Sequence, residues 1–152
     1  MEHGGVTNRV DDAVEFFARG YSCAQAVLLA YAPSVGIESG QAMRVAAGFA
    51  AGMRLGGTCG AVTGGVMVLG LSMCHDGCAT REERARLADP VSDFSAEFAR
   101  RLGALDCPAV LGCDLRTDEG WAQAEEQQLF RTVCLRAVRE AATILDGMVP
   151  RA

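Results

Sequence analysis

The feature that most limits the fold is a run of 20 residues, from Leu55 to Cys74, that carries no charged side chain. A run of this length is about what a helix needs to cross a bilayer, and a fully buried core helix has the same pattern. Six glycines interrupt the run, and only its second half is strongly apolar. We therefore expect a buried helix in a globular core, beginning at Cys59 and ending at about Met73.

Signals for helix starts and stops recur along the chain, whereas no alternating strand pattern does. Ser22 is a predicted N-cap, and Gln25 completes the pattern of a capping box. Thr80 and Glu83 repeat this pattern, and Pro90 suits a first helical position. The expected helices run from Val10 to a stop at Gly20, from Ser22 to near Pro33, from Ala42 to Met53, from Cys59 to about Met73, from Pro90 to Gly103, and from Asp118 to Asp146. A further short helix is expected to start at Thr80.

These signals predict an all-α fold, a single-domain bundle of about six or seven helices that takes in residues 1–152. A hydrophobic fraction of 50% with 22% charged residues is typical of a globular chain of this size. The net charge of -5 argues against a nucleic-acid-binding protein, because such proteins neutralise phosphates with basic side chains. All 14 basic residues are arginine, which excludes lysine Schiff bases and the phosphate-binding lysine of Walker motifs.

The imbalance between seven cysteines and two histidines favours thiolate chemistry over imidazole catalysis. The first residues lack the basic segment and apolar run of a secretory signal, so we expect a cytoplasmic protein. In a reducing cytosol, cysteines serve more often as metal ligands, redox-active thiols or small buried residues than as structural disulfides. The odd number of cysteines also prevents complete pairing within one chain.

Two cysteines share a local context at predicted helix starts. Cys23 follows Ser22 and Cys59 follows Thr58, so each lies in the first turn after a predicted cap. Backbone amides and the helix dipole favour negative charge at that place, which predicts a lowered thiol pKa suited to a metal ligand or a redox nucleophile. The alternative is that both are small buried apolar residues.

The other cysteines give weaker signals. Cys107 lies in a predicted turn between helices, and Cys134 lies inside the predicted last helix, where core packing is the common role. Cys74 and Cys78 flank His75 in a loop that is either a metal site or simply solvated. The spacings of the cysteines match neither CxxC pairs nor zinc-finger patterns.

Glycines recur every four residues from Gly48 to Gly64. On a helix, this spacing would place them on one face, where they would allow either tight helix packing or close approach of a cofactor or partner subunit. The candidate cofactor-contacting residues are Gly57, Gly60 and Gly64. The five glycines at this spacing are Gly48, Gly52, Gly56, Gly60 and Gly64.

Taken together, several segments resemble the C_GCAxxG_C_C family of redox-active proteins, from about Ala13 to Ile144. The segments that carry the resemblance are Gly20–Val27, Cys59-Gly60-Ala61-Val62-Thr63-Gly64, Cys107 with Leu111–Leu115, and Cys134. The resemblance implies a small, mostly helical protein with four characteristic cysteines, and some relatives are associated with an iron-sulfur cluster. Matched residue by residue, those cysteines are Cys23, Cys59, Cys107 and Cys134 here, whereas Cys74, Cys78 and Cys113 depart from the basic pattern.

The leading hypothesis is a redox protein in which these four cysteines hold an iron-sulfur cluster of unspecified nuclearity for electron transfer or redox sensing. A second hypothesis is a thiol-disulfide oxidoreductase with Cys23 or Cys59 as nucleophile, and a third is a structural zinc protein. Whether the chain is an enzyme stays open. A redox partner is expected, and the small-residue helix faces are compatible with a homodimer.

Overall fold

The computed structural model describes residues 8–151, and over this range the protein is helical, which confirms the all-α prediction. The helices are α1 (Arg9–Ala18), α2 (Cys23–Val35), α3 (Ser39–Ala46), α4 (Gly60–Met73), α5 (Arg81–Ala85), α6 (Ala88–Leu102), α7 (Cys107–Leu111), α8 (Asp118–Glu126) and α9 (Leu135–Asp146). A 3-10 turn covers Ala47–Phe49, a π-helical segment covers Phe130–Cys134, and Gly52–Gly56 form an irregular turn in which Met53 and Arg54 have positive φ angles. Within this range the one β-type pairing is an isolated bridge between Thr58 and Asp106.

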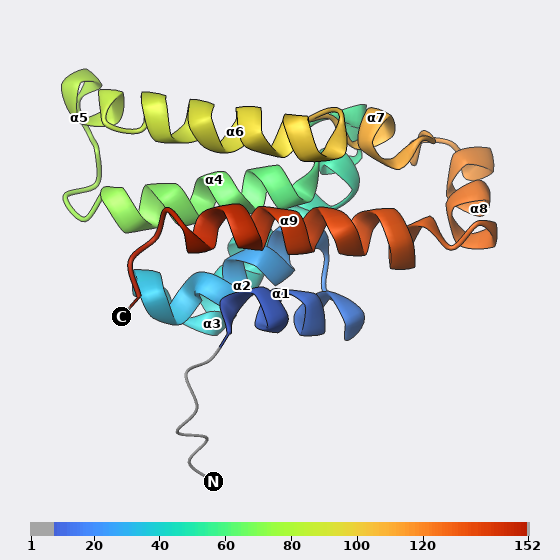
Figure 1. The fold of residues 1–152 in the computed structure, drawn as a ribbon, viewed down its shortest axis with the longest axis horizontal. Coiled ribbons are helices and arrows are strands. Elements are labelled where there is room, and N and C mark those ends of the chain that lie inside the picture. Colours follow the sequence, from blue (N-terminus) through green and yellow to red (C-terminus); the bar gives the residue numbers. More distant parts are fainter. Residues whose placement is uncertain (1–7, 152) are drawn as a thin grey trace, which may run out of the picture.

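The charge-free run forms α4, which lies in the middle of the bundle and packs against α2, α6 and α9 (Figure 1). Its side chains Val62, Val68 and Leu69 are buried, as a core helix requires. None of the helices formed by residues 8–151 combines the length and the apolar character needed to cross a membrane. The prediction of a buried core helix is therefore confirmed, with the helix beginning at Gly60.

A second layer, made of α1, α2 and α9, closes the core on one side of α4. The buried Tyr31 hydroxyl on α2 donates a 2.6 Å hydrogen bond to the carbonyl of Ala142 on α9. Arg9 at the start of α1 is also buried, stacks 4.5 Å from the centre of the Tyr31 ring and forms an ion pair with Asp146. These contacts join the first helix to the last.

Several predicted helix boundaries are confirmed. Ser22 and Gln25 form the capping box of α2, and Thr80 and Glu83 form that of α5. The helix that carries the buried Phe94 and Phe98 ends at Gly103 in a left-handed conformation, as expected of a glycine stop.

Three other boundaries differ from the predictions. Helix α2 continues through the exposed Pro33 to Val35 and ends at Gly36, because a proline near the end of a helix removes only one backbone hydrogen bond. Pro90 is the third residue of α6, which begins at Ala88. Cys107 begins the short helix α7 instead of lying in a turn.

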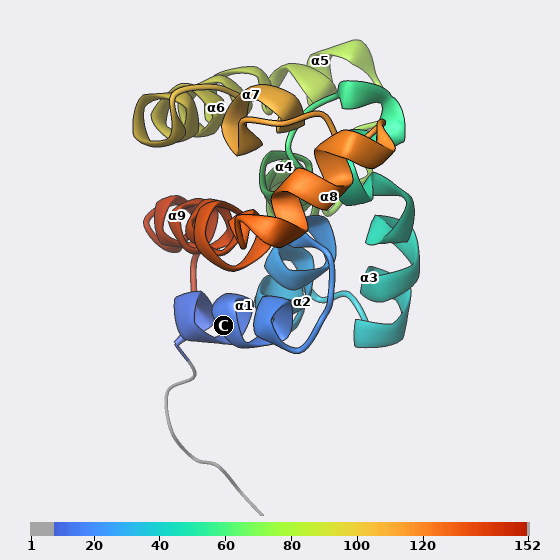
Figure 2. The same cartoon turned by 90° about the vertical axis from the view of Figure 1, so that its right-hand side faces the viewer.

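Two predicted helices are interrupted by left-handed residues. The expected helix from Ala42 to Met53 stops at Ala46, where a 3-10 turn follows, and it cannot resume because Ala51, Met53 and Arg54 have positive φ angles that no right-handed helix accommodates. The expected helix from Asp118 to Asp146 divides into α8, the π-helical segment and α9, with Gln128 at a φ of 55° between them. As a result, α8 lies across one end of the bundle (Figures 1 and 2).

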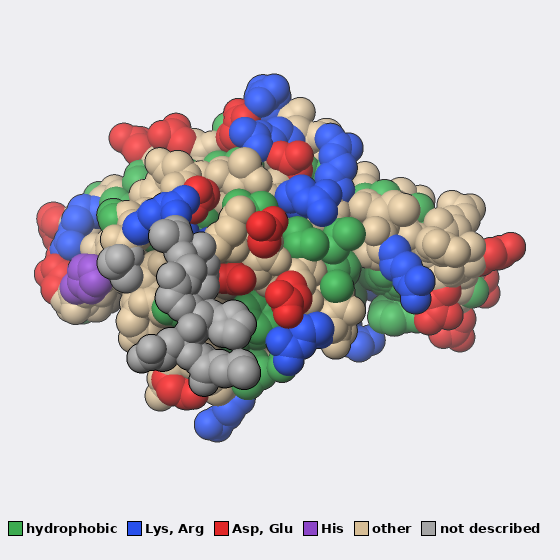
Figure 3. Space-filling view, turned by 60° about the horizontal axis from the view of Figure 1, so that its bottom comes forward, with side chains coloured by type: hydrophobic (Ala, Val, Ile, Leu, Met, Phe, Trp, Pro, Cys, Tyr) green, Lys and Arg blue, Asp and Glu red, His purple; other side chains and the backbone are tan. Residues whose placement is uncertain are grey.

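Charged side chains of both signs are interspersed on the face seen in Figure 3, with hydrophobic patches between them. Ion pairs near the surface include those of Arg101 with Glu97 and Glu140, at 2.8 and 2.7 Å. This mixture leaves most of the apolar side chains for the interior, where α2, α4 and α9 meet.

Candidate functional site

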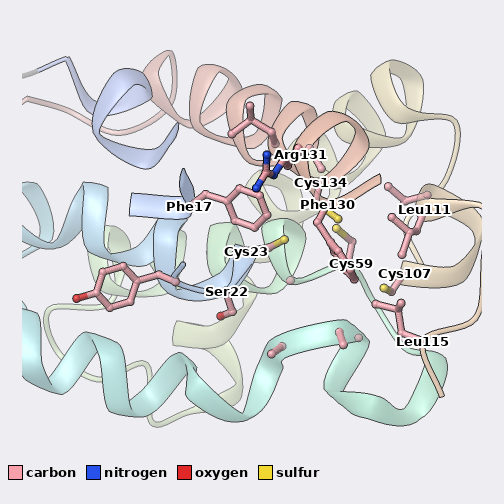
Figure 4. Close-up of a pocket in the computed structure, with 18 of the residues that line it drawn as sticks. Phe17, Ser22, Cys23, Cys59, Cys107, Leu111, Leu115, Phe130, Arg131 and Cys134 are labelled. Carbon is pink, nitrogen blue, oxygen red and sulfur yellow. The ribbon is translucent and has the colours of Figure 1, made fainter. Parts of the chain in front are cut away.

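Four cysteines from four separate segments line one cavity of about 690 Å³ (Figure 4). Cys23 is the first residue of α2, and Cys59 immediately precedes α4. Cys107 is the first residue of α7, and Cys134 ends the π-helical segment before α9. Residues that are up to 111 positions apart in sequence thus surround a single space at the end of the bundle near α8.

The rest of the cavity wall is mainly apolar. Phe17 projects from α1, and Leu111 and Leu115 project from α7 and the loop that follows it (Figure 4). Trp121 on α8 and Phe130 pack against each other, with ring centres 5.3 Å apart. This lining shields the cysteines from much of the solvent.

Two arginines, Arg54 and Arg131, add positive charge to the lining. Arg131 extends from the π-helical segment towards Phe17 (Figure 4). Sequence reasoning missed both arginines, and no local motif marks them.

Two backbone hydrogen bonds place Cys59 and Cys107 side by side. The Cys59 N–H donates to the carbonyl of Leu105, and the Cys107 N–H donates to the carbonyl of Gly57, both at 2.7 Å. The isolated bridge between Thr58 and Asp106 lies between these two bonds. The segment before α4 is therefore tied to the segment before α7, so the two cysteines enter the cavity from adjacent segments of the backbone.

Two glycines of α4 allow α2 to approach closely. A Cβ at Gly60 would lie 3.1 Å from the Cβ of Cys23, and one at Gly64 would lie 2.8 Å from the backbone oxygen of Ala24. Only hydrogen at these positions leaves room for the α2 backbone. Gly60 and Gly64 thus fix the start of α2, with Cys23, against the start of α4, with Cys59.

The three candidate cofactor glycines have different surroundings. Gly60 is part of the cavity wall, whereas Gly57 and Gly64 are outside it. Gly57 accepts the Cys107 hydrogen bond, and Gly64 faces Ala24. Cofactor contact by these glycines stays a prediction.

The four-residue glycine repeat does not form one helical face. Gly52 and Gly56 have positive φ angles in the irregular segment that precedes α4. Gly60 and Gly64 are the members of the repeat that lie within α4. Tight packing, one of the two interpretations of the repeat, is therefore what these last two glycines provide.

Cys23 and Cys134 are joined by a hydrogen bond between their thiol groups. With the Cys23 thiol as donor and the Cys134 sulfur as acceptor, this bond raises the pKa of Cys23, and burial raises it further. The same bond lowers the pKa of Cys134, because it stabilises a thiolate there. Cys134 is therefore the thiol of this pair that ionises first.

The other two thiols of the cavity are difficult to ionise. Burial raises the pKa of Cys59 to about 11, and the nearby backbone N–H groups of Ala61 and Val62 offset this effect only in part. Burial, followed by the nearby Cys59 charge, raises the pKa of Cys107 to about 12.

The predicted lowering of the Cys23 and Cys59 pKa values is therefore wrong. The amides of the first turn of α4 lie near Cys59, but none forms a cap hydrogen bond with its side chain, and loss of solvent outweighs their effect on its pKa. The predicted Thr58 cap is wrong as well, because Cys59 itself is the N-cap residue and Thr58 pairs with Asp106.

The four thiols line the same cavity, but they do not lie close enough together to bind one metal ion. Across residues 8–151, no three side chains of His, Cys, Asp or Glu lie close enough together to hold a metal ion. Cys113 is half-buried and stays outside the cavity lining.

The loop around His75 is a disulfide loop. Cys74 and Cys78 are bonded to each other, with their Cα atoms 5.2 Å apart. This pair was not predicted, because a cytosolic setting argued against disulfides. The signal that could have found it is the short spacing of two cysteines around Gly77, which forms a turn with a φ of 91°.

Comparison with known proteins gives one match. A family model described as "Putative redox-active protein (C_GCAxxG_C_C)" matches residues 21–148, a range that includes all four cavity cysteines. No curated protein and no solved structure matches the chain.

Proposed function

The chain belongs to the C_GCAxxG_C_C family of redox-active proteins, and on this premise we propose that its four-cysteine cavity holds an iron-sulfur cluster for electron transfer or redox sensing. The observation that supports this proposal is the convergence of Cys23, Cys59, Cys107 and Cys134 on one cavity. Two cysteines would suffice for disulfide chemistry, whereas four thiolates are the usual ligand set of such clusters.

The donor set fits this group in number and chemical type. Thiolate sulfur is a soft ligand that suits iron-sulfur clusters and zinc, and a space of about 690 Å³ lies between the four side chains. The thiols would have to draw closer together, since no three of them hold a metal-binding arrangement within the described residues. When bound, a cluster supplies reversible electron transfer.

The protein's own residues have defined roles in this proposal. The N–H groups of Ala61 and Val62 lie near Cys59, and amides in this place would stabilise negative charge on its sulfur and raise the reduction potential of a bound cluster. Phe17, Trp121 and the other apolar lining residues exclude water from the sulfur atoms. Gly60 keeps Cys23 next to Cys59.

A second candidate function is thiol-disulfide exchange, which the hydrogen bond between Cys23 and Cys134 favours. The Cys134 thiolate would attack a substrate disulfide and release one substrate thiol. Cys23 would then attack the mixed disulfide, release the second thiol and leave a Cys23–Cys134 disulfide. This order replaces Cys23 or Cys59 with Cys134 as the nucleophile, because Cys134 is the thiol with the lowered pKa.

The test is to purify the protein without oxygen and to measure its visible absorption together with iron, zinc and acid-labile sulfide. The cluster proposal expects iron and sulfide in comparable amounts, with visible absorption that bleaches on reduction. The Cys107→Ser variant should lose them, whereas Cys113→Ser, which changes a cysteine outside the cavity, should keep them.

Each other result points to a different function. A colourless, metal-free protein that forms a reversible Cys23–Cys134 bond would support thiol-disulfide exchange. Stoichiometric zinc without redox activity would make the four cysteines structural.

A further inference from the structure

We propose that the Cys74–Cys78 disulfide is a second redox site, separate from the four-cysteine cavity, which accepts two electrons from a reduced dithiol protein docked in the apolar groove beside it. This inference does not depend on the function proposed for the cavity. Its basis is the place of the disulfide in the fold, the unequal exposure of its two cysteine residues, the groups that hold its loop, and the adjacent groove.

The two sulfur sites lie at opposite ends of α4 (Figure 1). Cys59 precedes the helix at the end near α7, and Cys74 follows it at the end near α5. At about 1.5 Å per residue, the 14 residues of α4 separate the two ends by about 21 Å. A thiol of the cavity cannot exchange directly with the disulfide over this distance.

The two halves of the disulfide are not equally accessible. Cys74 is half-buried at the end of α4, whereas Cys78 is 6% exposed. Residues 75–77, which connect them, are exposed. An attacking thiolate therefore reaches the sulfur of Cys74, and Cys78 is the leaving group.

Arg84 and Arg86, in and just after α5, hold the part of the loop around Cys78. Arg84 donates to the carbonyls of Cys78 and Ala79 at 3.4 and 2.8 Å, which places positive charge beside the Cys78 backbone. Asp76 accepts a bond from the Cys78 N–H at 3.3 Å and one from Arg86 at 2.6 Å. These bonds hold the backbone of the leaving residue, Cys78, through both its N–H and its carbonyl group.

Cys78 has a φ of 47°, a conformation that residues other than glycine seldom adopt. The disulfide and the bonds to Asp76 and Arg84 keep this backbone in place. Opening the disulfide removes one of these restraints, so the loop can relax after reduction.

An apolar groove of about 580 Å³ begins at the disulfide. Cys74 and His75 lie at its edge, and Val45, at 56% exposed, presents an aliphatic side chain to solvent. The remaining apolar lining consists of Leu28, Val35, Ile37, Met67 and Leu71. Because Cys74 is part of the wall, a partner seated there must bring its reacting group to that sulfur, and an apolar wall suits a protein surface better than a small charged thiol.

The exchange balances in atoms and electrons. A thiolate of the partner attacks the Cys74 sulfur, the Cys74–Cys78 bond breaks, and Cys78 leaves as a thiolate that takes up a proton. The second thiol of the partner then attacks its own sulfur in the mixed disulfide and releases Cys74 as a thiol. The partner dithiol is oxidised to a disulfide, and the Cys74–Cys78 disulfide is reduced to two thiols.

The test uses the full chain, oxidised in air, with a thioredoxin kept reduced by its reductase and NADPH as the dithiol protein. Alkylation followed by mass spectrometry reports which cysteines become thiols over time. We expect Cys74 and Cys78 to be reduced together, and a thioredoxin that lacks its second active-site cysteine to remain bonded to Cys74.

Two surface variants test the groove. Val45→Glu should slow reduction by thioredoxin about tenfold, because it places a charge in the apolar contact. Reduction by dithiothreitol should be unchanged in this variant. Leu55→Glu, at a residue that is 73% exposed and outside the groove, is the matched control and should behave as the unmodified protein.

Several results would overturn the proposal. Recovery of Cys74 and Cys78 as free thiols after aerobic purification would show that the disulfide does not form in solution. Reduction by dithiothreitol or glutathione but not by thioredoxin would exclude a dithiol protein as donor. Trapping at Cys78 would contradict the assigned order, and equal rates for Val45→Glu and Leu55→Glu would exclude the groove.

Discussion

The thiols of Cys23 and Cys134 share a hydrogen bond that raises the pKa of Cys23 and lowers that of Cys134, and it links the first residue of α2 to the segment that precedes α9. Because this bond lowers the pKa of Cys134, the Cys23→Ala variant should raise it and slow alkylation of Cys134 in the metal-free protein. The measurement is the alkylation rate of Cys134 as a function of pH, with Cys113→Ser as control. An unchanged midpoint in Cys23→Ala would show that the bond does not set the reactivity of Cys134.

The contact between α2 and α4 should depend on the missing side chain at Gly64. Gly64→Ala places a Cβ 2.8 Å from the backbone oxygen of Ala24, so it should lower the free energy of unfolding by about 1–3 kcal/mol. Gly70→Ala is the matched control on the same helix, because nothing lies within 4 Å of its added Cβ. The control should be neutral or more stable by up to about 1 kcal/mol in urea unfolding, since alanine favours the helix. Equal effects of the two changes would contradict this account.

The ion pair of Arg9 with Asp146 should make stability depend on acid pH. The Arg9 guanidinium, at 2.8 Å, holds the pKa of Asp146 below its usual range. The pair therefore stabilises the fold above the unfolded-state pKa of about 3.9, and this contribution is lost as the pH falls through the lower folded-state pKa.

The Asp146→Asn variant should be about 1–2 kcal/mol less stable than the unmodified protein at pH 7 by urea unfolding. The difference should shrink below about pH 4, where the unmodified protein begins to lose the same interaction. Asp93→Asn, which changes an exposed carboxylate on α6, should have little effect at either pH. A pH-independent difference for Asp146→Asn would argue against the ion pair as its cause.

The two capping boxes should differ in how much they contribute to the global stability of the fold. Ser22→Ala removes the cap of α2, which carries Cys23 and much of the core, and should cost about 1 kcal/mol of global stability. Thr80→Ala removes the cap of α5, which has no buried residue and can unfold locally without exposing the core. Thermal unfolding should therefore shift clearly for Ser22→Ala and little for Thr80→Ala, and similar shifts would contradict this reasoning.

The sequence predicted the features that neighbouring residues determine. The Ser22 capping box depends on residues within one helical turn, and Gly103 ends its helix through its own backbone freedom. Burial of α4 followed from the absence of charge along it. These features need no information about distant parts of the chain.

The features that the sequence did not predict depend on contacts between distant residues. The left-handed backbones of Ala51 and Gln128 have no local signature, because neither residue type favours a positive φ. The thiol pKa values depend on burial and on the contact of Cys23 with Cys134, which only the folded chain creates. The resemblance to a family selected the four cysteines of the cavity, but their spacing alone does not show that they meet.

The close packing of α2 on α4 means that the four cavity cysteines are not held equally firmly. Cys23 and Cys59 stand on long helices whose backbones touch at Gly60 and Gly64, so their separation is fixed by the core. Cys107 stands on a five-residue helix, and Cys134 ends a π-helical segment without buried residues. Because backbone hydrogen bonds also hold Cys107 beside Cys59, adjustment to the size of a bound group falls to Cys134, while the other three cysteines provide a constant reference surface against which that group is positioned.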